Sequence, residues 1–167
     1  ILLLFFLVTP QKRIINNRDF DYEFYITQDE VKHPKDGRFY YWYKSGQIHH
    51  SKSAIGGSVL HDSYMKYYKS SQLAEKGNFK LGLKDGVWRT WNEEGELQVV
   101  EEWKKGVKNG KFIQYDSVGK MIVRGQFQNH KQHGTWIDYV SKDTLVYKKG
   151  VVIPKKLLLS RALIQLN

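Results

Sequence analysis

The chain has no cysteine, and proline occurs only 3 times in its 167 residues. Without cysteine there is no disulfide bond, thiolate metal site or thiol nucleophile. Phosphate-binding loops, dinucleotide-binding fingerprints and nucleophile elbows are also missing from the sequence. His130 and His133 have the spacing of metal ligands, but the segment that carries them contains no acidic residue. We therefore expect a protein that is not an enzyme and that binds neither a cofactor nor a metal ion.

Aromatic residues and glycine are plentiful, with 11 Tyr, 8 Phe, 5 Trp and 14 Gly. Aromatic side chains favour β-strands, and glycine favours the tight turns between strands. The hydrophobic fraction of 41% is ordinary for a globular protein and argues against disorder. The length suits one domain or a short repeat array. The composition therefore predicts an all-β fold rich in hairpins.

Residues 1–8 form a continuous apolar run. The run is too short for a membrane-spanning helix, which needs about 20 residues, but it has the length of the apolar part of a secretory signal. We interpret residues 1–10 as the remainder of a signal peptide, and a buried first strand is the alternative. The signal interpretation predicts an exported protein that is periplasmic, bound to the cell envelope or secreted.

Residues 11–34 and 151–167 flank the central part of the chain and are predicted to cap it. Apolar and acidic residues alternate from Asp19 to Thr27, which predicts a half-buried strand. Leucines recur at helical spacing after Pro154, which predicts a short terminal helix. This helix also carries lysine and arginine, so contact with an anionic membrane is an alternative to capping an open sheet end.

Between these ends the sequence repeats. The reference position of each copy, called the mark below, is a glycine that recurs three times at a spacing of 24 residues. These glycines are Gly86, Gly110 and Gly134. Gly37 marks an earlier copy, and Ser63 takes the equivalent position in a weaker copy. Periods of this length indicate a repeat architecture, predicted here to cover residues 35–150 in about five copies.

Two columns of large side chains follow the mark. The residues two positions after it are Phe39, Met65, Trp88, Phe112 and Trp136. The residues five positions after it, all rings with a polar atom, are Trp42, Tyr68, Trp91, Tyr115 and Tyr139. A second turn comes next and ends on glycine in the best copies, as a type I turn followed by a left-handed residue requires.

Each copy is therefore predicted to be a β-hairpin, with the marked glycine in a tight turn before its first strand. One hairpin is marginally stable in water, whereas stacked hairpins bury a continuous core in which each unit contacts its neighbours. The sequence predicts an elongated, twisted antiparallel meander sheet of tandem hairpins with a short C-terminal capping helix.

Two segments carry the pattern most clearly, KDGVWRTWNEEGELQVVEEWKKG and KNGKFIQYDSVGKMIVRGQFQNH. They resemble the MORN-repeat variant found in bacterial proteins, many of them labelled antitoxin-like. The resemblance covers Lys35 to about Gly150. It implies an elongated sheet of hairpins with a binding or scaffold role, and it implies no enzymatic activity.

The two columns lie three residues apart, so regular alternation would place them on opposite faces of the sheet. Rings with polar tips suit a surface that is apolar at one end and wet at the other. We expect the column five positions after the mark to form an aromatic stripe that binds an extended peptide or stacks on sugar rings. The alternative is a single core, in which a bulge turns both columns inward.

The chain is basic, with 27 Lys and Arg against 17 Asp and Glu and a formal net charge of +10. Lysines recur at turns, where they keep exposed sheet edges soluble. The same charge attracts acidic proteins and lipid headgroups, whereas no nucleic-acid-binding module is recognisable and nucleic acid is not expected as a partner.

These features together predict a non-enzymatic binding or scaffold protein of the bacterial cell envelope. Its expected ligand is a protein partner, recognised by the aromatic stripe and the lysine-rich turns. A polysaccharide or an anionic membrane surface is the alternative ligand.

Overall fold

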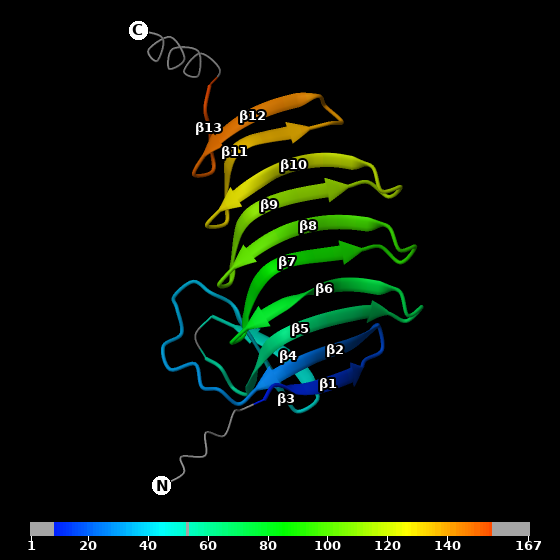
Figure 1. The fold of residues 1–167 in the computed structure, drawn as a ribbon, viewed down its shortest axis with the longest axis vertical. Helices are drawn as coiled ribbons and strands as arrows, with labels where there is room; N and C mark the ends of the chain where they lie inside the picture. The colour runs from blue at the N-terminus through cyan, green and yellow to red at the C-terminus, as the bar shows by residue number, and fades with distance from the viewer. Residues whose placement is uncertain (1–8, 53, 155–167) are drawn as a thin grey trace.

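The computed structural model describes residues 9–52 and 54–154, which form one sheet of 13 β-strands (Figure 1). No helix occurs among these residues. The strands are β1 (Gln11–Asn16), β2 (Phe20–Thr27), β3 (Tyr40–Lys44), β4 (Gln47–Ser51), β5 (Ser58–Tyr68), β6 (Leu73–Lys80), β7 (Leu83–Trp91), β8 (Leu97–Lys104), β9 (Val107–Tyr115), β10 (Met121–Gln128), β11 (Lys131–Asp138), β12 (Asp143–Lys148) and β13 (Val151–Val152). All pairs of neighbouring strands are antiparallel, so the predicted all-β fold is confirmed.

From β5 to β13 the sheet is an open meander, in which each strand pairs with the next strand along the chain. β2 pairs with the free side of β5, and β1 pairs with β2. Figure 1 shows the strands stacked along the long axis of the molecule, with β1 and β2 near one end and β12 and β13 at the other. The elongated meander predicted from the repeats is therefore confirmed.

The predicted signal peptide and the predicted C-terminal cap lie partly outside the described residues, whereas residues 11–34 are described in full and contain β1 and β2. Residues 151 and 152 form β13, which pairs with the end of β12. The helix predicted after Pro154 falls in residues 155–167 and lies outside the described part of the chain, as do residues 1–8 of the predicted signal peptide.

The hairpin of β3 and β4 leaves the path of the meander, which corrects the prediction that it is the first unit of the array. The strand β2 pairs along one side of β5, and β3 pairs with the opposite side, where Trp42 faces Val59 and Tyr43 faces Ser58. Because β6 occupies that side of β5 from Asp62 onward, β3 can pair only with the first residues of β5. The β3–β4 hairpin packs instead against one face of the sheet.

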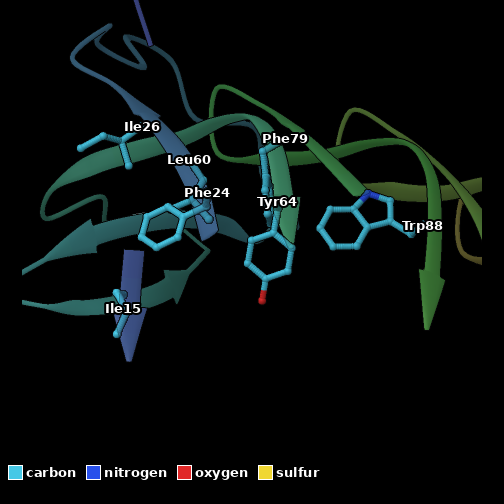
Figure 2. Close-up of a cluster of buried hydrophobic side chains, with 7 residues drawn as sticks. All are labelled: Ile15, Phe24, Ile26, Leu60, Tyr64, Phe79 and Trp88. Atoms are coloured by element: carbon cyan, nitrogen blue, oxygen red, sulfur yellow. The ribbon is translucent and has the colours of Figure 1, made fainter. Parts of the chain in front are cut away.

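The core is a cluster of buried side chains on that face, shown in Figure 2. Phe24 and Leu60 are 0% exposed and Trp88 is 1% exposed. The hairpin contributes Tyr41, whose ring centroid lies 5.0 Å from that of Phe79. Since burying one large apolar side chain contributes about 2 kcal/mol, the docked hairpin stabilises this end of the sheet.

The marked glycines of the three regular copies lie inside strands, which corrects the prediction of a tight turn at these positions, whereas Gly37 lies in a turn before β3 as predicted. Gly86 has a φ of 76° within β7, and Gly110 and Gly134 take positive φ values within β9 and β11. In β7, residues 86–88 lie between two regular pairs and face only Gly77 of β6. The marked glycine is therefore part of a β-bulge.

The tight turns come four to five residues before the bulge, and both of their central residues have positive φ. They are Leu81 and Gly82, Lys105 and Gly106, and Asn129 and His130. This is the type I′ geometry that matches the twist of a two-residue hairpin. Because bulge and turn both need a left-handed residue, a repeated glycine does not by itself distinguish the two.

In the second copy the bulge residue is Asp62, with a φ of 70°, and not the predicted Ser63. Asp62 lies 24 residues before Gly86, so the repeat keeps its period there. The large side chains two and five positions later are accordingly Tyr64 and Tyr67. Aspartate tolerates the left-handed region better than most residues, because its short side chain bonds locally.

Each tight turn is bonded to the strand that precedes its hairpin. The amides of Gly82, Gly106, His130 and Gly150 donate to the carbonyl oxygens of Leu60, Lys84, Lys108 and Gln132, with N to O distances of 2.7, 2.9, 3.0 and 2.8 Å. The acceptors are spaced by the repeat period. Each hairpin is therefore fixed to its predecessor by the same hydrogen bond.

The turns at the opposite ends of the strands have the predicted geometry. The amide of Gly95 donates to the carbonyl oxygen of Asn92 at 3.1 Å, and the amide of Asn92 donates to that of Glu96 at 3.0 Å. Gly95 and Gly119 have φ values of 91° and 78°. A type I turn followed by a left-handed glycine is confirmed at both places.

Candidate binding surfaces

The two predicted columns lie on opposite faces of the sheet in the regular repeats. Along β7 the side chains alternate, so Trp88 and Trp91 point to opposite sides. We call the side of Trp88, which carries the buried cluster, the core face, and the side of Trp91 the outer face. The bulge at Gly86 precedes both residues and does not bring them together.

In the three regular copies the column two positions after the mark, which is Trp88, Phe112 and Trp136, lies on the core face, whereas Phe39 of the first copy is 45% exposed. The indoles of Trp88 and Trp136 lie on Gly77 and Gly125, where a Cβ would overlap the rings. Ring centroids follow one another along the core face, such as Phe112 and Trp136 at 5.5 Å. Trp136 is 8% exposed, so these rings stabilise the sheet and are not open to a partner.

The outer face carries Trp91, Tyr115 and Tyr139 at equal spacing in the chain. Trp91 is paired with Leu97, and Tyr115 with Met121, so that apolar side chains of β8 and β10 lie between the rings. Trp91 and Tyr115 are half-buried, and Tyr139 is 43% exposed. We call this row the outer-face stripe. Its members are Tyr67, Leu73, Trp91, Leu97, Tyr115, Met121 and Tyr139.

Two of the five predicted stripe residues lie elsewhere. Tyr68 is on the core face, where its ring centroid is 5.5 Å from that of Phe20, and its hydroxyl donates to the carbonyl oxygen of Trp91 at 2.9 Å. The adjacent Tyr67 takes its place on the outer face, because the second copy starts at Asp62.

Trp42 is separate from the meander, on the β3–β4 hairpin. Its ring stacks on His49 with centroids 4.5 Å apart, and its Nε1 donates to Ser51 Oγ at 3.2 Å. The rings that do lie in one row are therefore Trp91, Tyr115 and Tyr139 of the predicted set.

A basic row runs beside the stripe on the outer face. Lys76 of β6 is paired with Arg89 of β7, and Arg124 of β10 is paired with Ile113 and Ile137 on its two sides. Paired residues share a face of the sheet, so all three cations lie on the outer face. Their aliphatic parts extend the apolar surface, and their charged ends favour an acidic ligand.

Sequence reasoning missed a cavity of about 480 Å³ between the β3–β4 hairpin and the core face. Its walls include five rings, which belong to Tyr22, Tyr41, Tyr64, Phe79 and Trp88. Lys66, Glu75 and Lys84 supply charged groups to the same cavity. No local pattern could have indicated it, because it exists only where a hairpin distant in the sequence docks on the sheet.

The hydroxyl groups in this cavity are held in their neutral form. Burial, and then the carboxylate of Glu75, raise the pKa of Tyr64 above its ordinary value of 10.0. The same two causes, in the same order, raise the pKa of Tyr41 and of Tyr22. Three phenol groups and one carboxylate therefore line the same cavity, and the phenols are available as hydrogen-bond donors.

Within the described part of the chain, the Glu and His side chains do not gather at one catalytic or metal-binding site. Within residues 9–52 and 54–154, no three His, Asp or Glu side chains form a group that could hold a metal ion. Glu101 pairs with Lys108 Nζ at 2.6 Å, whereas Glu102 accepts from the Lys111 amide at 3.0 Å. The histidine of the tight turn, His130, accepts from the Lys108 amide through Nδ1 at 3.4 Å. In the described part of the chain, no helix is long and apolar enough to cross a membrane.

No family model, curated protein or solved structure matches the chain. The resemblance to MORN repeats therefore stays a prediction from the sequence.

Proposed function

We propose that this protein is a non-enzymatic binding or scaffold protein that recognises a protein partner through the outer-face stripe. One observation carries the proposal: the rings of Trp91, Tyr115 and Tyr139 lie on the face opposite the core and remain partly exposed. Aromatic side chains of this kind dominate the energy of protein interfaces because they bury a large area with few rotatable bonds.

The expected ligand is an extended segment of the partner. Strands are about 4.8 Å apart, so Trp91 and Tyr115 are about 10 Å apart along the sheet and Trp91 and Tyr139 about 19 Å. A peptide in the extended polyproline II conformation rises about 3.1 Å per residue with three residues per turn. Apolar side chains three residues apart then point to the same side about 9 Å apart and would contact successive rings. Acidic residues between them would face the basic row of Lys76, Arg89 and Arg124.

The place of action belongs to the same proposal. The apolar run at residues 1–8 and the resemblance to MORN repeats of bacterial proteins both support a role at the bacterial cell envelope, in the periplasm or after secretion. The lysines at hairpin turns, such as Lys105 and Lys149, add positive charge at the ends of the strands.

Affinity capture from a cell-envelope extract tests this proposal. The bait is the chain from Gln11 onward, beside a double variant that carries Trp91→Ala and Tyr115→Ala. A matched control carries Val151→Ala, because Val151 is an exposed apolar residue (69%) in β13, where it pairs with Lys148, and it is not part of the stripe. Circular dichroism verifies that all three baits are folded.

The expected result is a captured protein that the double variant loses and the control keeps. The partner, identified by mass spectrometry and purified, should show the same dependence and should bind through an extended acidic and apolar segment. Parallel assays use insoluble polysaccharide and vesicles of anionic lipid. Retention by either of these that depends on Trp91 and Tyr115 would replace the protein partner with the alternative ligand, and identical capture by all baits would overturn the proposal.

A further inference from the structure

The cavity beneath the β3–β4 hairpin combines aromatic walls with hydrogen-bonding groups that the protein leaves unused. Its volume of about 480 Å³ lies within the range of about 300 to 1,000 Å³ that is typical of small-molecule sites. Tyr64 is 8% exposed, and Figure 2 shows its hydroxyl directed away from the strands. Within residues 9–52 and 54–154, the hydroxyls of Tyr22, Tyr41 and Tyr64 form no hydrogen bond with another protein group.

The charged side chains of the cavity already make some contacts within the protein. Glu75 Oε1 accepts from Lys84 Nζ at 2.8 Å, and the two side chains are 23% and 15% exposed. Lys84 Nζ also lies 3.8 Å from the centroid of the Trp88 ring. Lys66, which is paired with Glu75 across the strands, lies over Phe20 at 3.6 Å. The lining therefore holds two ammonium groups, one carboxylate, three phenol hydroxyls, the imidazole of His50 and the amides of Asn17 and Gln47.

The charged, phenolic and aromatic groups of the cavity favour some classes of ligand over others. A lipid chain would desolvate the Lys84–Glu75 pair without giving it a hydrogen bond, which is costly. A free cation would be repelled by the Lys84 ammonium, which already lies over the Trp88 ring, and by the ammonium of Lys66. A sugar ring suits both parts of the lining, because its C–H face packs on aromatic rings and its hydroxyls exchange hydrogen bonds with carboxylate, ammonium and phenol groups.

We propose that the cavity between the β3–β4 hairpin and the core face binds a pyranose ring of a neutral or acidic saccharide. Tyr41 packs on the ring, and Glu75, Lys66, Lys84 and the Tyr64 hydroxyl bond its hydroxyl groups. The site lies on the face opposite the outer-face stripe and does not depend on the proposed protein partner. Its failure or success can therefore be separated from that of the proposed function by variants on each face.

Titration calorimetry with three trisaccharides tests the site. The probes are cellotriose, tri-N-acetylchitotriose and trigalacturonic acid, which present plain, acetamido and carboxylate-bearing pyranose rings. The chain from Gln11 onward is compared with Glu75→Gln and Tyr64→Phe, which keep the shape of the side chains. The matched controls are Glu93→Gln, in an exposed loop, and Tyr115→Phe, on the outer face. Melting temperatures verify that all the variants remain folded.

The expected result is saturable binding of at least one trisaccharide, weakened about tenfold by Glu75→Gln because a hydrogen bond to a charged group is lost. Tyr64→Phe should weaken binding by a smaller factor, and both controls should bind as the unchanged chain does. The proposal is overturned if none of the three sugars binds. It is also overturned if Glu75→Gln and Tyr64→Phe bind normally, or if Tyr115→Phe loses binding, since the sugar would then lie on the outer face.

Discussion

The indole of Trp88 lies flat against the backbone of Gly77 on the neighbouring strand, in a space that a Cβ would fill. The two residues face each other at the β-bulge of β7, and the same contact recurs 48 residues later between Trp136 and Gly125. A glycine on one strand therefore makes room for the largest side chain on the next strand. This contact is one reason why the repeat can hold a tryptophan on a single-layered sheet.

Replacing Gly77 by alanine should lower the free energy of unfolding by about 3 kcal/mol, because the added methyl group overlaps a ring that cannot move. Trp88 is 1% exposed and lies against Phe79 at a centroid distance of 5.0 Å. Urea denaturation measures the loss. The comparison is Gly37→Ala, where nothing lies within 4 Å of the new methyl group but φ is +71°. Its expected cost is about 1 kcal/mol, and equal losses in the two variants would contradict the role given to Gly77.

Asp62→Gly should raise the free energy of unfolding by about 1 kcal/mol, because glycine adopts the left-handed conformation without strain. Asp62 has a φ of 70° and is exposed, so little else is lost with its side chain. Ser63→Gly should lower stability by about 0.5 to 1 kcal/mol, because glycine weakens an ordinary strand position. Melting temperatures of the two variants would move in opposite directions. If Asp62→Gly lowered the melting temperature and Ser63→Gly raised it, the bulge residue of this copy would be Ser63.

Trp88→Ala and Trp91→Ala should differ strongly in stability, although the two residues are three positions apart. Loss of the buried Trp88 is expected to cost about 4 kcal/mol, as for other large side chains in cores. Loss of the half-buried Trp91 is expected to cost about 1 kcal/mol, because the outer face has no second layer to collapse. Chemical denaturation of both variants provides the measurement. A loss at Trp91 as large as that at Trp88 would make the outer-face stripe part of the core.

Alkaline pH should destabilise the protein through Tyr64. The folded-state pKa of Tyr64 lies above the ordinary value of 10.0, so the stabilisation is fully present below that pH and is lost as pH rises further. Above about pH 10 the unfolded chain releases this proton while the folded protein keeps it, which reduces stability by about 1.4 kcal/mol per pH unit. Unfolding free energies measured between about pH 9 and about pH 11 should fall less steeply in Tyr64→Phe. Parallel curves for the two proteins would exclude Tyr64 as the cause.

The hairpin array was predictable because its signals are local. The turns that end on Gly95 and Gly119 need only four residues, and the residues between bulges recur at a fixed spacing. The separation of Trp88 from Trp91 follows from alternation alone. Local chemistry could not distinguish a bulge from a turn at Gly86, because both use the same backbone region. The same ambiguity hid Asp62, since aspartate also reaches that region.

Long-range placement was not predictable from the same signals. Nothing in the pattern around Trp42 shows that β2 occupies the pairing positions beside β5, because this choice depends on the fit of two strands separated by the β3–β4 hairpin. The cavity that contains Tyr64 and Glu75 arises from the same choice. Its residues come from the seven strands β1 to β7 and from the turn between β1 and β2, so no single segment of the sequence carries its signature.

The hydrogen bond that joins each tight turn to the preceding strand makes every repeat structurally equivalent to the next. Gly106 repeats the contact of Gly82, and His130 repeats that of Gly106. Deleting or duplicating one 24-residue unit would therefore change the length of the molecule by two strand spacings, about 10 Å, without changing the cavity at the other end. In this architecture the number of repeats determines how long a ligand the outer face can hold, so affinity for an extended partner could change in steps through gain or loss of whole units.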